Sequence, residues 1–231
     1  MSDPVFENED NYMIMTMEEI RKYETETYFA TATKDENNIN GDTISTFEGY
    51  GDKKYMLICD GMASGEQASF TSQMCASFLE KILSISSAEK HLSLSMLNNF
   101  VRSRNAECSS SIDLMEIDLL NGNSSFMKSG AAPSFIKRGD NVYKLHSKTA
   151  PIGIMKGLDA EQLSFMLKKG DICVMVSDGI VASEEESTWL VDLIKSTENR
   201  ELPLLADLII KEAKEKSSRE DDMSVGVLLI K

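Results

Sequence analysis

Apolar residues recur at two different spacings along this chain, and each spacing predicts a different kind of element. Short apolar or alternating runs predict strands over residues 27–33, 43–48 and 55–60. The segments between them, residues 34–42 and 49–54, are rich in Asp, Asn, Gly and Lys and are typical of turns. These strands therefore follow one another closely, as in an antiparallel sheet.

Helical spacing follows in two pairs of segments. Apolar residues return every three or four positions in residues 66–84 and again in residues 89–105. Near the C-terminus, the same spacing predicts helices over residues 188–196 and 202–216. Each pair is expected to pack against a sheet.

The middle of the chain is rich in hairpin signals. Asn121-Gly122 separates two alternating runs, and residues 134–145 form a second strand–turn–strand pattern. Residues 162–180 repeat that pattern around Lys169-Gly170-Asp171, which predicts a third hairpin, and residues 223–230 predict a closing strand. Antiparallel hairpins with helices inserted in pairs predict an α+β domain, most simply two packed antiparallel β-sheets flanked by helices.

The first 25 residues differ from the rest because they are polar and Met-rich, and they close with MTMEEIRKYE, residues 15–24. We interpret residues 1–25 as a lead-in to the domain, with a short regulatory or dimerising helix as the functional alternative. Residues 26–231 contain no repeat, low-complexity run or linker, so one domain of that span is predicted.

Composition excludes several classes of function. The 231 residues carry a net charge of −14, which disfavours binding to the phosphate backbone of nucleic acid. The four cysteines show no CxxC spacing and only two histidines accompany them, so no zinc site is expected. No apolar run approaches the length of a membrane span, and the acidic start lacks the pattern of a secretory signal. We expect a soluble, cytoplasmic chain.

Acidic residues stand where predicted strands enter or leave a sheet. Two apolar runs end in Asp-Gly, at Asp60-Gly61 and at Asp178-Gly179. Two further strands are preceded by Gly41-Asp42 and by Asp221-Asp222. If these ends meet in space, the carboxylates repel one another, and a bound cation is the simplest relief.

Oxygen ligands without histidine or cysteine favour a hard ion such as Mg²⁺ or Mn²⁺. The glycine after Asp60 would let the backbone turn sharply and offer its carbonyl to a metal. The alternative is that each aspartate is only a turn residue, since Asp is common in turns. The pattern alone does not bring the four positions together.

At these positions the chain resembles the metal-dependent protein serine/threonine phosphatases of type 2C, the PPM family, and most closely the phosphatase domain of stage II sporulation protein E. The resemblance extends from about residue 27 to residue 231. Its central segments are SGAAPSFIKRGD, residues 129–140, and APIGI, residues 150–154. Its acidic motifs, in order, are Gly41-Asp42, Asp60-Gly61-Met62, Ser177-Asp178-Gly179 and Asp221-Asp222-Met223.

The resemblance implies a four-layer α-β-β-α sandwich with two Mn²⁺ or Mg²⁺ ions at one edge. Asp60 would bridge the ions, and Asp42 would serve the second ion partly through water. Asp222 would orient the metal ligands without binding a metal ion itself. The full set of implied metal ligands is Asp42, Asp60, Gly61, Asp178 and Asp221.

The implied reaction is hydrolysis of phosphoserine or phosphothreonine by a hydroxide that bridges the two ions. Asp60, Asp178 and Asp221 would act catalytically by holding that metal-bound water. The implied substrate is a phosphorylated regulatory protein, a STAS-domain anti-sigma-factor antagonist, in bacterial sporulation and sigma-factor regulation. Full-length relatives carry a membrane-spanning portion, and no such span is expected in this sequence. A homodimer is a further possibility that the sequence does not decide.

The helices predicted over residues 66–84 and 89–105 would act as a switch in the resembling subfamily. The alternative is that they only pack on a sheet, and the sequence does not separate the two interpretations.

Some positions depart from the pattern of the relatives. Met62 stands where many of them have a histidine that protonates the leaving oxygen, and Ala63 stands where close relatives have glycine. If residue 63 needs a positive φ, its β-carbon strains the loop. Cys59 is interpreted as a core residue because no phosphate-binding C-x5-R loop follows it, and Lys34 as a solvated lysine rather than a phosphate ligand.

Two other classes of function compete with the phosphatase. A weak or inactive binding module of the same fold would hold a phosphoprotein without cleaving it. An inert oligomerisation scaffold would leave the aspartates at the strand ends unexplained.

Overall fold

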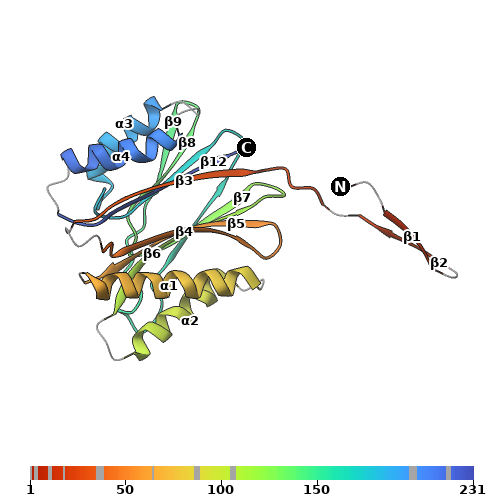
Figure 1. Cartoon of the computed structure of the whole chain (residues 1–231), viewed down its shortest axis with the longest axis horizontal. Coiled ribbons are helices and arrows are strands. Elements are labelled where there is room, and N and C mark those ends of the chain that lie inside the picture. The colour runs from red at the N-terminus through yellow and green to blue at the C-terminus, as the bar shows by residue number, and fades with distance from the viewer. Residues whose placement is uncertain are drawn as a thin grey trace.

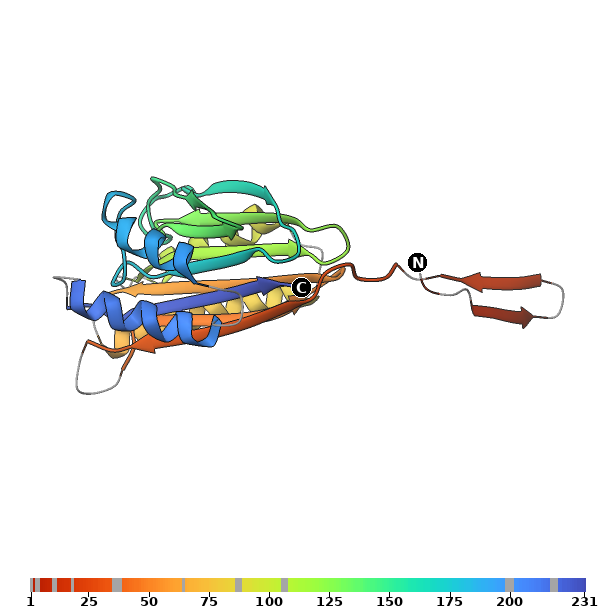
Figure 2. The same cartoon turned by 90° about the horizontal axis from the view of Figure 1, so that it is seen from above.

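The computed structural model describes residues 2, 5–9, 12–17, 19–34, 39–63, 65–85, 89–104, 108–197, 202–216 and 220–231, with the backbone alone for 5–9 and 12–14. Two five-stranded antiparallel sheets pack face to face, and a pair of helices covers the outer face of each sheet (Figures 1 and 2). The α+β sandwich predicted from the sequence is confirmed.

The first sheet has the strand order β10-β7-β6-β5-β4. Helices α1 and α2 cover it, and their leucines pack against Leu57 and Leu114 of the sheet (Figure 1). The elements of this half are β4 Asp42–Gly49, β5 Lys53–Met62, α1 Glu66–Ile85, α2 Lys90–Ser103, β6 Ser109–Asp118, β7 Asn123–Ser129 and β10 Glu161–Met166.

The second sheet has the strand order β3-β12-β11-β8-β9. Helices α3 and α4 cover its outer face (Figure 1). The elements of this half are β3 Thr25–Ala32, β8 Ser134–Arg138, β9 Asn141–Leu145, β11 Ile172–Val176, the 3-10 helix η1 Glu185–Ser187, α3 Thr188–Ser196, α4 Leu202–Lys216 and β12 Met223–Ile230. In the described part of the chain, no helix has the length and apolar character needed to cross a membrane.

Strand β5 shows how the sandwich gives its central strands a continuous apolar sequence. Met56 and Ile58 pack between the two sheets, whereas Leu57 and Cys59 pack against the helices. Successive side chains of a strand point to opposite faces, so a strand buried on both faces is apolar at every position.

A buried ion pair interrupts the apolar layer between the sheets. Lys128 Nζ of β7 lies 2.5 Å from Asp113 Oδ2 of β6 and 2.7 Å from Ser134 Oγ of β8 in the other sheet. Burial lowers the pKa of Lys128, and the Asp113 charge opposes that shift. The pair thus joins the two sheets through polar contacts.

The hairpin predicted around Lys169-Gly170-Asp171 is wrong. Strand β10 pairs with β7 in the first sheet, whereas β11 pairs with β8 and β12 in the second, so this segment crosses between the sheets. Asp171 Oδ2 accepts hydrogen bonds from Arg138 Nη2 at 2.6 Å and from the Lys168 amide at 2.8 Å. These contacts hold the crossing, and the same turn formers serve either connection.

Residues 1–25 contain a strand pair where the sequence offered a helix. Strands β1 Val5–Glu9 and β2 Tyr12–Thr16 form an antiparallel hairpin that extends away from the sandwich (Figures 1 and 2). The amides of Lys22 and Tyr23 donate to the Leu119 carbonyl at 2.9 and 3.1 Å. The proposed helix is therefore wrong for the described residues, since β2 and the irregular residues 19–24 take its place. The boundary near residue 25 stays a prediction.

Candidate metal centre

The four acidic motifs meet at one end of the sandwich. Asp42 opens β4 and lies directly opposite Asp60 of β5 in the antiparallel register. Asp60, Asp178, Asp221 and Asp222 line a pocket of about 200 Å³, together with the backbone of Gly41 and Gly61. Asp42 and Asp60 belong to strands of the first sheet, whereas Asp178 follows β11 and Asp221 and Asp222 precede β12 of the second sheet.

The glycine of each Asp-Gly motif is required by space. A Cβ on Gly61 would lie 2.1 Å from the Ala68 carbonyl oxygen of α1, and a Cβ on Gly179 would lie 2.1 Å from the Asp222 carbonyl oxygen. The sharp turn expected at Gly61 is wrong, because β5 continues to Met62. The two glycines instead let neighbouring backbone come close behind the aspartates.

Burial and mutual repulsion perturb two of these carboxylates. Burial, followed by the charges of Asp42, Asp178 and Asp221, raises the pKa of Asp60 to about 8. Burial also raises the pKa of Asp42 to about 7, with smaller contributions from Asp178 and Asp222. Both groups therefore hold their charge poorly without a nearby cation.

Asp42 also has a buried carboxylate oxygen, Oδ2, without a hydrogen-bond donor among the described residues. The nearby hydroxyls of Ser177 and Ser224 lower the pKa of Asp42 without satisfying this atom. A buried carboxylate oxygen without a donor is costly, and a cation would satisfy it.

Asp222 binds the backbone at both ends of the connection between β3 and β4. Its Oδ2 accepts from the Gly41 amide at 2.7 Å, and its Oδ1 accepts from the Lys34 amide at 3.0 Å. Lys34 then extends its ammonium group to within 3.1 Å of Asp221 Oδ1. The interpretation of Lys34 as a solvated lysine is therefore wrong, because its ammonium group pairs with one of the predicted metal ligands.

The side chains are not yet arranged as a finished coordination shell. Within the described residues, no three His, Cys, Asp or Glu side chains form a group that could hold a metal ion. The oxygen-rich set fits a hard divalent cation in chemistry and in charge. For Asp221 to bind such a cation, it would have to exchange its contact with Lys34.

The backbone strain predicted at Ala63, in the loop after β5, is confirmed. Ala63 has a φ of 128°, a conformation that only glycine adopts easily, and it lines the pocket. Met62 is half-exposed beside it and offers no proton.

Cys59 takes no part in this chemistry. It is fully buried, and burial raises the pKa of its thiol well above the ordinary value. The neutral thiol belongs to the core, as the sequence predicted.

Two polar residues of the site escaped the sequence reasoning. Ser224, the second residue of β12, donates its amide to Ser177 Oγ at 2.9 Å, while the Ser177 amide donates to the Ser224 carbonyl at 2.9 Å. Ser110 Oγ donates to the Asp60 carbonyl at 2.9 Å. A serine inside the apolar closing strand was the only available signal.

A four-layer sandwich with aspartates at the ends of strands from both sheets defines the type 2C phosphatase architecture. The family model described as "Stage II sporulation protein E (SpoIIE)" matches residues 51–231. The chain therefore belongs to the SpoIIE family, and the resemblance inferred from its motifs is confirmed.

Two stage II sporulation protein E sequences are similar over most of this chain. The Bacillus subtilis protein is 36% identical and the Priestia megaterium protein 32% identical, over 91% and 90% of this chain. The chain spans only 26% and 36% of the length of these two relatives.

Solved structures agree with the architecture. The structure of the PP2C phosphatase domain and a fragment of the regulatory domain of Bacillus subtilis SpoIIE matches with 33% identity and a TM-score of 0.83, over 98% of this chain and 69% of that chain. The SpoIIE phosphatase domain in a crystal form without domain swapping matches with 34% identity and a TM-score of 0.69, over 91% and 94%. RsbX in complex with magnesium, at 12% identity, a TM-score of 0.70 and coverage of 99% and 100%, shares the fold.

Proposed function

We propose that this chain is a metal-dependent protein phosphatase that hydrolyses phosphoserine or phosphothreonine on a regulatory protein. It would use two Mn²⁺ or Mg²⁺ ions held by Asp42, Asp60, Gly61, Asp178 and Asp221. The observation that carries the proposal is the meeting of all four acidic motifs around one pocket, with Asp42 directly opposite Asp60.

The bound ions would supply an activated water and would offset the charge of the phosphoryl group. The protein's own residues position the proposed metal ligands. Strands β4 and β5 fix Asp42 and Asp60 against each other, and Asp222 orients the segments that carry Lys34 and Gly41. Gly61 lets the backbone of α1 pack closely behind Asp60, because a side chain there would collide with Ala68.

Proton transfer to the leaving serine oxygen has no candidate at residue 62. Met62 replaces the histidine that many relatives have at that position, and a thioether carries no proton at neutral pH. Solvent would then supply the proton, which is consistent with a modest turnover rate.

Membership of the SpoIIE family supports a phosphorylated protein as the substrate. We propose a small phosphoserine-bearing regulator, a STAS-type anti-sigma-factor antagonist, as the partner. The net charge of −14 argues against a nucleic acid as the recognised partner.

The test is hydrolysis of a phosphoserine STAS-domain protein with Mn²⁺, with EDTA, and by the Asp178→Asn variant. We expect phosphate release with Mn²⁺ and its loss in both controls, at equal folding by circular dichroism. A folded protein that binds Mn²⁺ without releasing phosphate from any phosphoserine protein would instead be the inactive binding module. Failure to bind Mn²⁺ would contradict the site assignment itself.

A further inference from the structure

A second polar pocket, of about 390 Å³, lies on the first sheet far from the candidate metal centre. Lys53, at the start of β5, lines it, whereas Asp60 lies near the other end of the same strand. Seven residues of extended strand separate them, which is about 23 Å. The pocket therefore does not belong to the candidate metal centre.

A row of polar side chains crosses the sheet at this pocket. Tyr55, Glu116, Ser125 and Ser164 lie opposite one another on β5, β6, β7 and β10. Tyr55 packs with the leucines of α1 and α2, so the row lies on the face that these helices cover. Glu116 and Ser125 are buried, yet both line the pocket.

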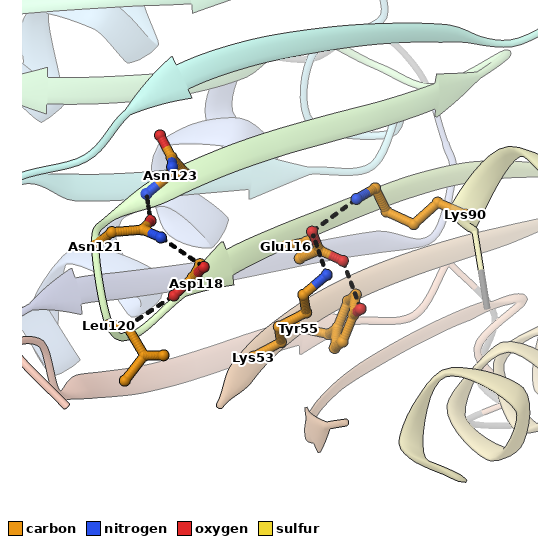
Figure 3. Close-up of polar contacts among 8 residues, drawn as sticks. All are labelled: Lys53, Tyr55, Lys90, Glu116, Asp118, Leu120, Asn121 and Asn123. Carbon is orange, nitrogen blue, oxygen red and sulfur yellow. Dashed lines mark hydrogen bonds and ion pairs between the residues drawn. The ribbon is translucent and has the colours of Figure 1, made fainter. Parts of the chain in front are cut away.

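Glu116 is the centre of a converging set of donors (Figure 3). Tyr55 Oη donates to its Oε2 at 2.5 Å, and Lys90 Nζ lies 2.7 Å from its Oε1. Lys53 Nζ approaches the same Oε1 at 3.4 Å. Burial raises the pKa of Glu116, but the hydrogen bonds from Lys90 and Tyr55 and the charges of the two lysines together outweigh it. The pKa of Glu116 is therefore lowered, and this residue is a carboxylate at neutral pH.

Both carboxylates that line the pocket already accept hydrogen bonds, whereas its donor groups are only partly used. Asp118 also lines the pocket, but its oxygens accept from the Leu120 amide at 2.8 Å and from Asn121 Nδ2 at 2.7 Å (Figure 3). Each ammonium group has three hydrogens, and two ammonium groups share one Glu116 oxygen. Ser125 Oγ is buried and has no hydrogen-bond partner among the described residues.

We propose that this pocket binds a small tetrahedral oxyanion of the phosphate type. The ammonium groups of Lys53 and Lys90 line the same pocket as the hydroxyl groups of Ser125 and Ser164, so its donors come from four different elements, β5, α2, β7 and β10. A tetrahedral anion with several acceptor oxygens matches that arrangement better than a planar carboxylate does. The four ionised side chains sum to zero charge, so directed hydrogen bonds, and not excess charge, give the selectivity.

Lys90 gives the site a connection to the helices, because it is the first residue of α2. An anion that draws the Lys90 ammonium away from Glu116 loosens the tie between the start of α2 and the sheet. The proposal does not depend on the phosphatase activity of the metal centre.

The test is a titration of the metal-free protein with inorganic phosphate, in EDTA and at constant ionic strength set with chloride. Backbone amide NMR shifts locate the binding. We expect saturable shifts around Lys53, Ser125 and Ser164 within millimolar phosphate, and none that saturate at Gly61 or Asp178.

Two variants and a matched control make the test specific. Lys53→Met and Ser125→Ala each remove donors, and each should weaken binding several-fold while the protein stays folded. Lys54→Met removes the same charge from the opposite face of β5, and it should bind like the wild type. Absence of saturable shifts, or equal weakening in Lys53→Met and Lys54→Met, would overturn the proposal.

Discussion

Replacing Asp60 with asparagine tests the crowding of carboxylates while keeping the volume of the side chain. Without a divalent cation, burial and the neighbouring charges raise the pKa of Asp60 from an ordinary 3.8 to about 8. Between these values the folded protein holds a proton that the unfolded chain has released, so stability is lost as the pH rises. From about pH 5 to about pH 7, at about 1.4 kcal/mol per pH unit, the wild type should lose roughly 3 kcal/mol relative to Asp60→Asn.

The assay is urea denaturation in EDTA, followed by circular dichroism at several pH values. In thermal unfolding, 1 kcal/mol corresponds to roughly 2–4 °C for a chain of this size. With Mn²⁺ in place of EDTA, the wild type should become more stable than Asp60→Asn. The ion binds and stabilises the folded wild type, whereas the variant lacks one of the proposed metal ligands. Asp140→Asn, in the exposed β8–β9 turn, is the control and should follow the wild type throughout. A parallel loss of stability in wild type and Asp60→Asn would refute the reasoning.

Three further substitutions test other parts of the structure. Ala63→Gly should relieve the positive φ and raise the free energy of unfolding by about 1 kcal/mol in urea, and a destabilised variant would contradict the strain. Lys34→Met removes the ammonium group beside Asp221, so calorimetry should find Mn²⁺ bound about 2–5-fold more tightly; weaker binding would mean that Lys34 organises the site. Lys128→Met leaves Asp113 as an uncompensated buried charge and should cost about 3–5 kcal/mol, much of it recovered when Asp113→Leu is added; a single variant as stable as the wild type would contradict the buried pair.

Local pattern was sufficient wherever burial sets the spacing of residues. The run from Tyr55 to Cys59 is apolar at every position because the helices cover one face of β5 and the second sheet covers the other. The helices over 66–84 and 202–216 follow from the same reasoning at helical spacing. Ala63 could also be predicted, since the cost of a β-carbon at positive φ is a property of the residue itself.

Long-range contacts decide what local pattern leaves open. Turn formers at Lys169-Gly170-Asp171 suit a hairpin as well as a crossing, and Arg138, distant in sequence, holds the crossing. Lys128 lies at a strand position where alternation alone offers no reason for a buried cation; Asp113 and Ser134 supply the reason from two other strands. The Glu116 cluster likewise draws on β5, β6 and α2, so no single segment carries its signature.

The position of the candidate metal centre follows from the register of strand β5 more than from the shape of the loops. Met56 and Ile58 point between the sheets, so Asp60, two residues further along β5, points to the same side. Strand β5 is buried on both faces. A slip of one residue would exchange the side chains that face the second sheet with those that face the helices, so the position of Asp60 along the sheet is fixed. The same register places Asp42 of β4 opposite Asp60. A strand whose apolar residues fix its register can therefore hold a repelling pair of carboxylates together, which a flexible loop would let separate.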